Sequence, residues 1–217
     1  MKNNFAIIIS NTSRSFSYLK ALKKNKLYPN YIIHLDDGSK NSIYKKFIYN
    51  NYFFLNKNIK KINGKEINKK VAKFILKNKT LNIVYSGYPG LIVKDEIVLK
   101  KKKLIHSHPG KLPFFKGSTT IYYSLLKAKC IYCTTFILSK NLDNGKLLYI
   151  QKYKIPNYIK KIDNEFDDFI RTKNLIDVLQ NNYKNNYKNN YKNKSHKKTP
   201  YYVIHPVLRA IVMNKFK

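Results

Sequence analysis

The chain alternates between short apolar runs and stretches in which apolar residues recur at helical spacing. Four early runs have the length and character of buried strands, and they lie at 5–10, 31–35, 81–85 and 103–107. Two later runs, at 131–138 and 146–155, flank the turn dipeptide Asn144-Gly145 and predict an antiparallel pair. Strands that alternate with helices in this way predict an α/β fold with a mostly parallel central sheet flanked by helices.

Helical periods fill the gaps between these strands. Phe16, Leu19 and Leu22 would share one face of a helix that Ser13 or Ser15 caps. Further helices are predicted at 67–75, at 118–126 with Ser118 as its cap, at 166–175 and at 206–213, and a last strand at 201–205. The apolar residues of the helix at 166–175 are Phe166, Phe169, Ile170 and Leu175.

The segment 181–199 breaks this pattern. It repeats Asn-Asn-Tyr-Lys three times and has little to bury, while periodic elements resume at 201. We therefore predict a single domain over 1–217 that carries a flexible, low-complexity insertion at about 181–199. The repeat could alternatively stack on single-stranded nucleic acid, but nothing else in the sequence supports such readout.

The charge of the chain is large, with 44 lysine and arginine residues against 11 acidic residues and a formal net charge of +33. Taken alone, this would indicate nucleic acid or an anionic membrane surface as partner. However, only Arg14, Arg171 and Arg209 are arginines, although nucleic-acid readers favour the bidentate fork of arginine. Lysine abounds together with asparagine, isoleucine and tyrosine, which all have A/T-rich codons. The charge therefore argues only weakly for any partner.

Apolar content and cysteine usage indicate a cytoplasmic protein. No apolar run approaches the roughly 18 residues that span a bilayer, and the strip at 5–9 is too short for a signal-peptide core. The two cysteines, Cys130 and Cys133, form a C-x-x-C in an apolar setting without a second such pair. We interpret them as core or edge cysteines of a reduced protein and not as a redox or zinc site.

Candidate chemistry gathers at the end of the run at 103–107. His106 and His108 would lie on one face of that strand, and Pro109 and Gly110 would end it. The carboxyl edge of an open α/β sheet is where ligands bind. The two imidazoles could act as acid and base, stabilise negative charge, or bind a metal with a third ligand, and the alternative is a pair of structural histidines.

Asp143 is the best placed of the acidic residues to orient or balance such a histidine. It precedes the turn dipeptide Asn144-Gly145 and follows an apolar strand. The alternative is a simple Asx-turn aspartate.

Together these segments resemble the core of the 10-formyltetrahydrofolate-dependent formyltransferases. The family carries Asn-x-His-Pro, then Leu-Pro and a glycine, and later Asp-x-Gly-x-(Ile/Leu)-(Ile/Leu). The matching text here is His-Ser-His-Pro-Gly-Lys-Leu-Pro at 106–113, Gly117, and Asp-Asn-Gly-Lys-Leu-Leu at 143–148. The stretch 84–91 is similar to the family loop before that strand, so the resemblance covers about residues 80–150.

The resemblance implies a Rossmann-like formyltransferase fold and an enzyme that transfers a formyl group from 10-formyltetrahydrofolate to a small-molecule primary amine. It implies that His108 stabilises the tetrahedral oxyanion and moves protons, and that Asp143 keeps this histidine charged. It places the folate against two loops, whose residues are Gly87, Tyr88, Pro89, Gly90, Leu91, Leu138 and Leu142.

Two positions depart from the family. His106 stands where the family has an oxyanion-binding asparagine, and we expect a neutral His106 to donate its N–H instead. The segment 10–14 lacks the glycines of the phosphate loop found in purine-biosynthetic members. An amino sugar or sugar nucleotide is then left as the amine by elimination.

Two other functions stay open at this point. One is a metal-dependent hydrolase built on His106 and His108, and the other is a basic nucleic-acid-binding protein without catalysis. The sequence sets no oligomeric state.

Overall fold

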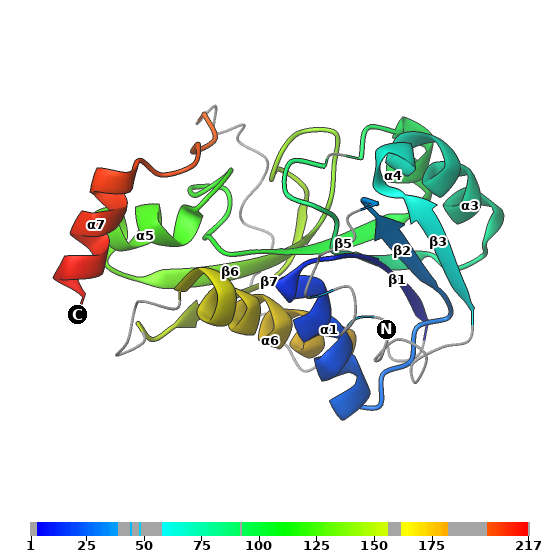
Figure 1. The fold of residues 1–217 in the computed structure, drawn as a ribbon, viewed down its shortest axis with the longest axis horizontal. Coiled ribbons are helices and arrows are strands. Elements are labelled where there is room, and N and C mark those ends of the chain that lie inside the picture. Colours follow the sequence, from blue (N-terminus) through cyan, green and yellow to red (C-terminus); the bar gives the residue numbers. More distant parts are fainter. Residues whose placement is uncertain are drawn as a thin grey trace. The chain divides into compact units, whose positions relative to one another are not determined.

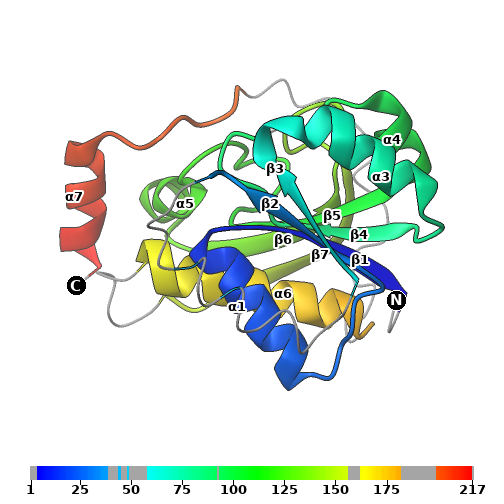
Figure 2. The same ribbon diagram turned by 45° about the vertical axis from the view of Figure 1, so that its right-hand side comes forward.

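A computed structural model describes residues 4–38, 44, 48, 58–91, 93–155, 162–181 and 199–216 (Figures 1 and 2). The chain divides into two compact units, Met1–His106 with Leu179–Asn181, and Ser107–Val178 with Asn182–Lys217. The predicted insertion lies outside the described residues, apart from its two ends. The single domain over 1–217 stays a prediction.

The first unit is built on parallel strands. They are β1 (Phe5–Ser10), β2 (Ile32–Asp36), β3 (Ile59–Asn63), β4 (Asn82–Tyr85) and β5 (Lys103–His108), in the order β3-β2-β1-β4-β5. The residues of β5 up to His106 belong to this unit, and its last two belong to the second unit. All six residues of β1 are buried, because a central parallel strand has both faces covered. Burial on both faces explains why the sequence of β1 is apolar at nearly every position and does not alternate with polar residues.

Helices cover both faces of this sheet. Helix α1 (Ser13–Lys24) lies on one side, and α3 (Ala72–Lys77) and α4 (Glu96–Lys101) lie on the other (Figure 2). The cap of α1 is Thr12, whose hydroxyl accepts the Ser15 N–H, and not the predicted Ser13 or Ser15. A π-helical turn, Ile67–Val71, leads into α3.

The second unit holds an antiparallel pair and three helices. Strand β6 (Ile131–Ile137) pairs with β7 (Lys146–Tyr153), as the turn dipeptide predicted. The helices are α5 (Thr120–Ala128), α6 (Asp167–Leu179) and α7 (Pro206–Lys215), with a π-helical turn at Ile162–Phe166. The last residue of α6, Leu179, belongs to the first unit. Their core includes Ile121, Leu125, Ile131, Ile170 and Val212.

Three expectations for the second unit are wrong in detail. Helix α5 is preceded by Thr119, in a left-handed conformation with φ +48°, and not by a Ser118 cap. The strand predicted at 201–205 is a single bridge between Tyr201 and Gly117. Phe169, predicted for the buried face of α6, is 55% exposed because that face is turned toward Ile170 and Asn174.

The predicted α/β architecture is nevertheless confirmed. Five parallel strands flanked by helices and one antiparallel pair reproduce the mostly parallel fold. In the part of the chain that the structure describes, no helix combines the length and apolar character needed to cross a membrane.

Candidate active site

His108 is the last residue of β5, and its side chain is buried at the strand end. Its Nε2 lies 2.7 Å from the carbonyl oxygen of Phe115. Because a carbonyl oxygen only accepts hydrogen bonds, Nε2 must carry the proton and donate it. In the neutral ring, Nδ1 therefore holds the lone pair.

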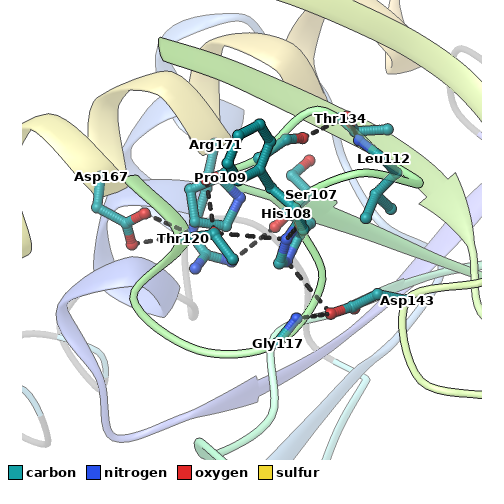
Figure 3. Close-up of polar contacts among 12 residues, drawn as sticks. Ser107, His108, Pro109, Leu112, Gly117, Thr120, Thr134, Asp143, Asp167 and Arg171 are labelled. Carbon is teal, nitrogen blue, oxygen red and sulfur yellow. Dashed lines mark hydrogen bonds and ion pairs between the residues drawn. The ribbon is translucent and has the colours of Figure 1, made fainter. Parts of the chain in front are cut away.

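Asp143 faces that lone pair. Its Oδ2 is 3.7 Å from His108 Nδ1 and accepts the Gly117 N–H at 2.7 Å (Figure 3). Both side chains are nearly fully buried. The distance between Nδ1 and Oδ2 suits an ion pair but exceeds a hydrogen bond. The structure thus brings together the histidine and the aspartate that the sequence singled out.

Two glycines allow the backbone to adopt the close approaches that position Asp143 and its hydrogen-bond donor. A Cβ on Gly145 would lie 1.6 Å from the Ile137 carbonyl oxygen, so only glycine fits the hairpin that carries Asp143. Gly117 has φ +94°, and a Cβ there would lie 2.2 Å from the Tyr201 carbonyl oxygen. The glycines of the sequence motif are therefore explained by close backbone approach.

Buried threonine hydroxyls fix the loop that follows His108. Thr134 Oγ1 donates to the Gly110 carbonyl at 2.5 Å and accepts the Leu112 N–H at 3.2 Å. Thr120 Oγ1 donates to the Pro109 carbonyl at 2.7 Å (Figure 3). Sequence reasoning missed both threonines, because their partners are backbone groups of a distant segment.

An ion pair on α6 supports the same strand end. Arg171 Nε donates to both carboxylate oxygens of Asp167 at 3.0 and 2.8 Å, and its Nη1 donates to the Ser107 carbonyl at 2.7 Å. Sequence reasoning missed this pair too, although its i,i+4 spacing is readable on a predicted helix.

Burial decides the protonation state of His108. Removal from water disfavours the charged ring and lowers its pKa, and this effect exceeds the opposing attraction of Asp143. Arg171 lowers the pKa further, while the hydrogen bond to Phe115 and the charge of Asp167 raise it. The net direction is downward, so burial favours the neutral form of His108. This direction runs against the expectation that Asp143 keeps the resting histidine charged, although Asp143 does raise the pKa of His108.

His106 has the opposite tautomer. Its Nδ1 lies 3.1 Å from the Tyr85 carbonyl oxygen and must donate to it, so Nε2 holds the lone pair of the neutral ring. A neutral His106 has thus already used the N–H that we expected it to offer to an oxyanion. It can donate from Nε2 only when the ring is protonated.

The first predicted folate loop, Gly87–Leu91, is anchored within the first unit. Its Leu91 carbonyl accepts the Tyr85 hydroxyl at 2.7 Å, and its Gly87 carbonyl accepts from the Arg14 guanidinium. The tip, Pro89 and Gly90, is exposed.

Tyr88 of this loop points back toward β1 and β2. Its hydroxyl donates to the Leu35 carbonyl at 3.1 Å and accepts the Asn11 N–H at 3.2 Å. Burial raises the pKa of Tyr88 to about 12, so the hydroxyl keeps its proton. Tyr88 therefore has a defined structural task besides the binding role predicted for it.

The second predicted folate segment lies in the β6–β7 turn. Leu138 is half-buried, and Leu142, next to Asp143, is 49% exposed. An accessible apolar side chain beside the carboxylate fits the flat ring of a pterin. The two loops belong to different units, and their role in folate binding stays a prediction.

The described residues offer no support for a metal enzyme. Among them, no three His, Cys, Asp or Glu side chains gather as a metal site would require. Cys133 is fully buried and Cys130 half-buried, as interpreted from the sequence.

Comparison with known proteins finds similarity in structure only. No protein-family model matches the sequence, and no curated protein matches it. A sugar N-formyltransferase from a Shewanella species is 15% identical, with 96% of this chain and 86% of that chain covered and a TM-score of 0.57. Glycinamide ribonucleotide transformylase 1 from Geobacillus kaustophilus is 16% identical, with coverages of 82% and 97% and a TM-score of 0.61.

This chain has the formyltransferase fold. A formyltetrahydrofolate deformylase from Pseudomonas syringae shares it at 15% identity, with coverages of 82% and 60% and a TM-score of 0.60. At such identities the likeness establishes the fold alone. The formyltransferase fold that the motifs at 106–117 and 143–148 predicted is thereby confirmed.

Proposed function

We propose that this protein transfers a formyl group from 10-formyltetrahydrofolate to a primary amine. One observation carries the proposal. At the end of β5 in a formyltransferase fold, a neutral His108 holds its lone pair toward the carboxylate of Asp143. A base with an adjacent stabilising charge is what proton movement in acyl transfer requires.

The donor supplies a carbonyl carbon that an amine can attack. His108 Nδ1 accepts the proton that the attacking nitrogen loses and returns it to the leaving nitrogen. The imidazolium formed between these events is stabilised by Asp143, 3.7 Å away. The hydrogen bond from Nε2 to Phe115 keeps the ring from turning throughout. General acid–base catalysis of this kind contributes about 10²- to 10⁴-fold.

His106 has a narrower role in this proposal. When its ring is protonated, Nε2 becomes a donor for the oxyanion, while Nδ1 stays bonded to Tyr85. The active form of His106 is therefore its charged form.

The proposed amine is an amino sugar, free or linked to a nucleotide. A phosphorylated amine would need the amide groups after β1, where helix α1 begins. Two of the amides there are engaged internally, since the Ser10 N–H at the end of β1 donates to Ser15 Oγ at 3.0 Å and the Asn11 N–H donates to the Tyr88 hydroxyl at 3.2 Å.

A labelled-donor assay tests the proposal. The protein is incubated with 10-formyltetrahydrofolate carrying a ¹³C-formyl group and with amino sugars, nucleotide-linked amino sugars or glycinamide ribonucleotide. We expect ¹³C-formamide on a sugar amine, detected by mass spectrometry, and none with the His108→Ala variant.

Other products would overturn defined parts of the proposal. Labelled formate without any formamide would mean that water is the acceptor and would contradict amine transfer. Formylation of glycinamide ribonucleotide alone would keep the transfer and contradict the amino sugar.

A further inference from the structure

A cavity of about 490 Å³ lies in the second unit, outside the His108–Asp143 pair. Its walls include two lysines and four aromatic rings, from Lys111, Lys127, Phe114, Phe115, Tyr132 and Tyr201. The volume falls in the range of small-molecule sites. Only Phe115 belongs to both places, because its ring lines the cavity while its carbonyl accepts from His108.

The aromatic wall is held in place by its own contacts. The Tyr201 ring stacks on Tyr123 with centroids 4.3 Å apart and on Phe115 at 5.9 Å, with interplanar angles of 22° and 20°. Its backbone is fixed as well, since the Tyr201 N–H donates to the Lys116 carbonyl and its carbonyl accepts the Ser118 N–H, both at 2.8 Å. A flat ligand would meet a rigid stack.

The cations of the cavity lie over these rings. Lys111 Nζ is 5.1 Å from the centroid of Tyr132 and 5.9 Å from that of Phe114, and Lys127 Nζ is 4.9 Å from that of Tyr201. The lining contains no acidic residue, and within the described ranges neither lysine has a salt bridge. An anionic group entering the cavity would therefore meet two cations without a competing carboxylate.

Lysine alone would not single out this cavity in so basic a chain. A cavity of about 460 Å³ in the first unit is lined by five lysines and has Phe74 as its single aromatic residue. One of those lysines, Lys61, is already paired with Asp36 at 3.3 Å. The combination of stacked rings and unpaired cations distinguishes the cavity of the second unit.

We propose that this cavity binds a nucleotide. The base stacks against the aromatic wall, and the phosphates bind Lys111 and Lys127. The same chemistry, a flat ring joined to an anion, also describes the p-aminobenzoylglutamate part of a folate, so the experiment must separate the two. The site goes beyond formyl transfer and does not depend on it.

Cys130 provides a reporter inside the cavity. It lines the cavity and is partly exposed, whereas Cys133 is fully buried and burial raises the pKa of its thiol. The chain has only these two cysteines, so a thiol-alkylating reagent reports on Cys130 in the folded protein. The Cys130→Ser variant verifies the assignment by losing the label.

In the first experiment, alkylation of Cys130 is followed with UDP, ADP, uridine, pyrophosphate or p-aminobenzoylglutamate. We expect a saturating nucleotide to slow alkylation about tenfold or more, and uridine or pyrophosphate to protect far less at equal concentration. No protection by either nucleotide would overturn the proposal. Stronger protection by p-aminobenzoylglutamate would also overturn it, in favour of a folate site.

In the second experiment, calorimetry compares two charge-matched double variants. Lys111→Gln with Lys127→Gln is expected to weaken nucleotide binding about tenfold or more. Lys152→Gln with Lys154→Gln removes the same charge from exposed residues elsewhere and should leave the affinity unchanged. Equal losses in both variants would overturn the site, because they would mean binding to the overall charge. Neither readout requires formyl transfer, so failure here is distinct from failure of the proposed enzyme.

Discussion

The segments that follow β1 and β5 occupy similar places in the chain, each between a buried parallel strand and a helix. After β1, polar groups bond to one another: Ser10 Oγ donates to the Ser86 carbonyl at 2.8 Å, and the hydroxyls of Ser15 and Ser86 are 2.8 Å apart. After β5, His108 uses one ring nitrogen internally and turns the other toward Asp143. The first segment is closed by its own hydrogen bonds, and the second keeps a base for chemistry.

The difference shows that position at a strand end does not by itself make a catalytic group. Both segments are polar and buried, but only the second holds a titratable side chain whose remaining nitrogen faces a charge. Because the Ser10 and Asn11 amides and the serine hydroxyls of this region bond internally, we assign that segment to stability.

Removal of the imidazole at the end of β5 should have the largest effect. We expect His108→Ala to lower formyl transfer by about 100-fold or more, because the proton acceptor is lost, and to leave folate binding within a few-fold. Turnover is measured with the labelled donor and folate binding by calorimetry. His205→Ala, at the exposed cap of α7, is the matched control. Unchanged turnover in His108→Ala would remove His108 from the mechanism.

Substitutions of His106 should separate donor chemistry from packing. An asparagine amide donates at any pH, whereas His106 donates from Nε2 only when charged, so His106→Asn should keep or raise the rate. His106→Ala has no donor, and we expect it to be about 100-fold slower than His106→Asn. Rates of both variants are compared across pH. Equal rates would show that no donor at this position contributes to the transition state.

Neutralisation of Asp143 should have a smaller effect, with a defined sign. In Asp143→Asn the amide oxygen can still accept the Gly117 N–H, but the charge that raises the pKa of His108 is gone. The pKa of His108 should fall further, and the limb of the pH–rate profile that reports it should move to lower pH. Each pKa unit corresponds to about tenfold in imidazolium stabilisation, so we expect a rate loss of about tenfold. A profile that moves to higher pH would contradict this account.

Loss of the Tyr88 hydroxyl, which bonds to the segment after β1 from the loop after β4, should change stability and not catalysis. Tyr88→Phe removes the hydroxyl that joins the Leu35 carbonyl and the Asn11 N–H, and we expect the free energy of unfolding to fall by about 1–2 kcal/mol. Urea denaturation measures this loss, and Tyr28→Phe, at a 48% exposed side chain, is the control. A fall in kcat at unchanged stability would show that the Tyr88 hydroxyl takes part in the chemistry.

Apolar patterning predicted the buried strands of the sheet and missed β3, which is mostly exposed. Strand β3 escaped notice because Ile62 is its one buried residue and Lys60 and Lys61 are exposed. The strand-end position of His108 and the turn at Asp143 could be predicted, since each follows from local sequence. The tautomer of His108 could not, because it depends on the Phe115 carbonyl, which any residue type would provide.

Sequence reasoning considered the three arginines only as part of the net charge and missed their individual contacts. In a chain where lysine dominates, each of the three arginines makes specific hydrogen bonds. Arg171 binds Asp167 and the Ser107 carbonyl. The other two bind groups in other segments, Arg14 through Ser86 and Gly87 and Arg209 through Tyr122 and Asp163. The rarity of arginine here marks positions where a planar, multidentate donor is needed.

The central claim, a neutral His108 whose lone pair faces Asp143, is tested most directly by NMR of ¹⁵N-histidine-labelled protein, with His108→Asn used to assign the signals. We predict a neutral ring at pH 7 with its proton on Nε2 and a pKa below the ordinary value for histidine. An imidazolium at pH 7, or a neutral ring with its proton on Nδ1, would contradict the account.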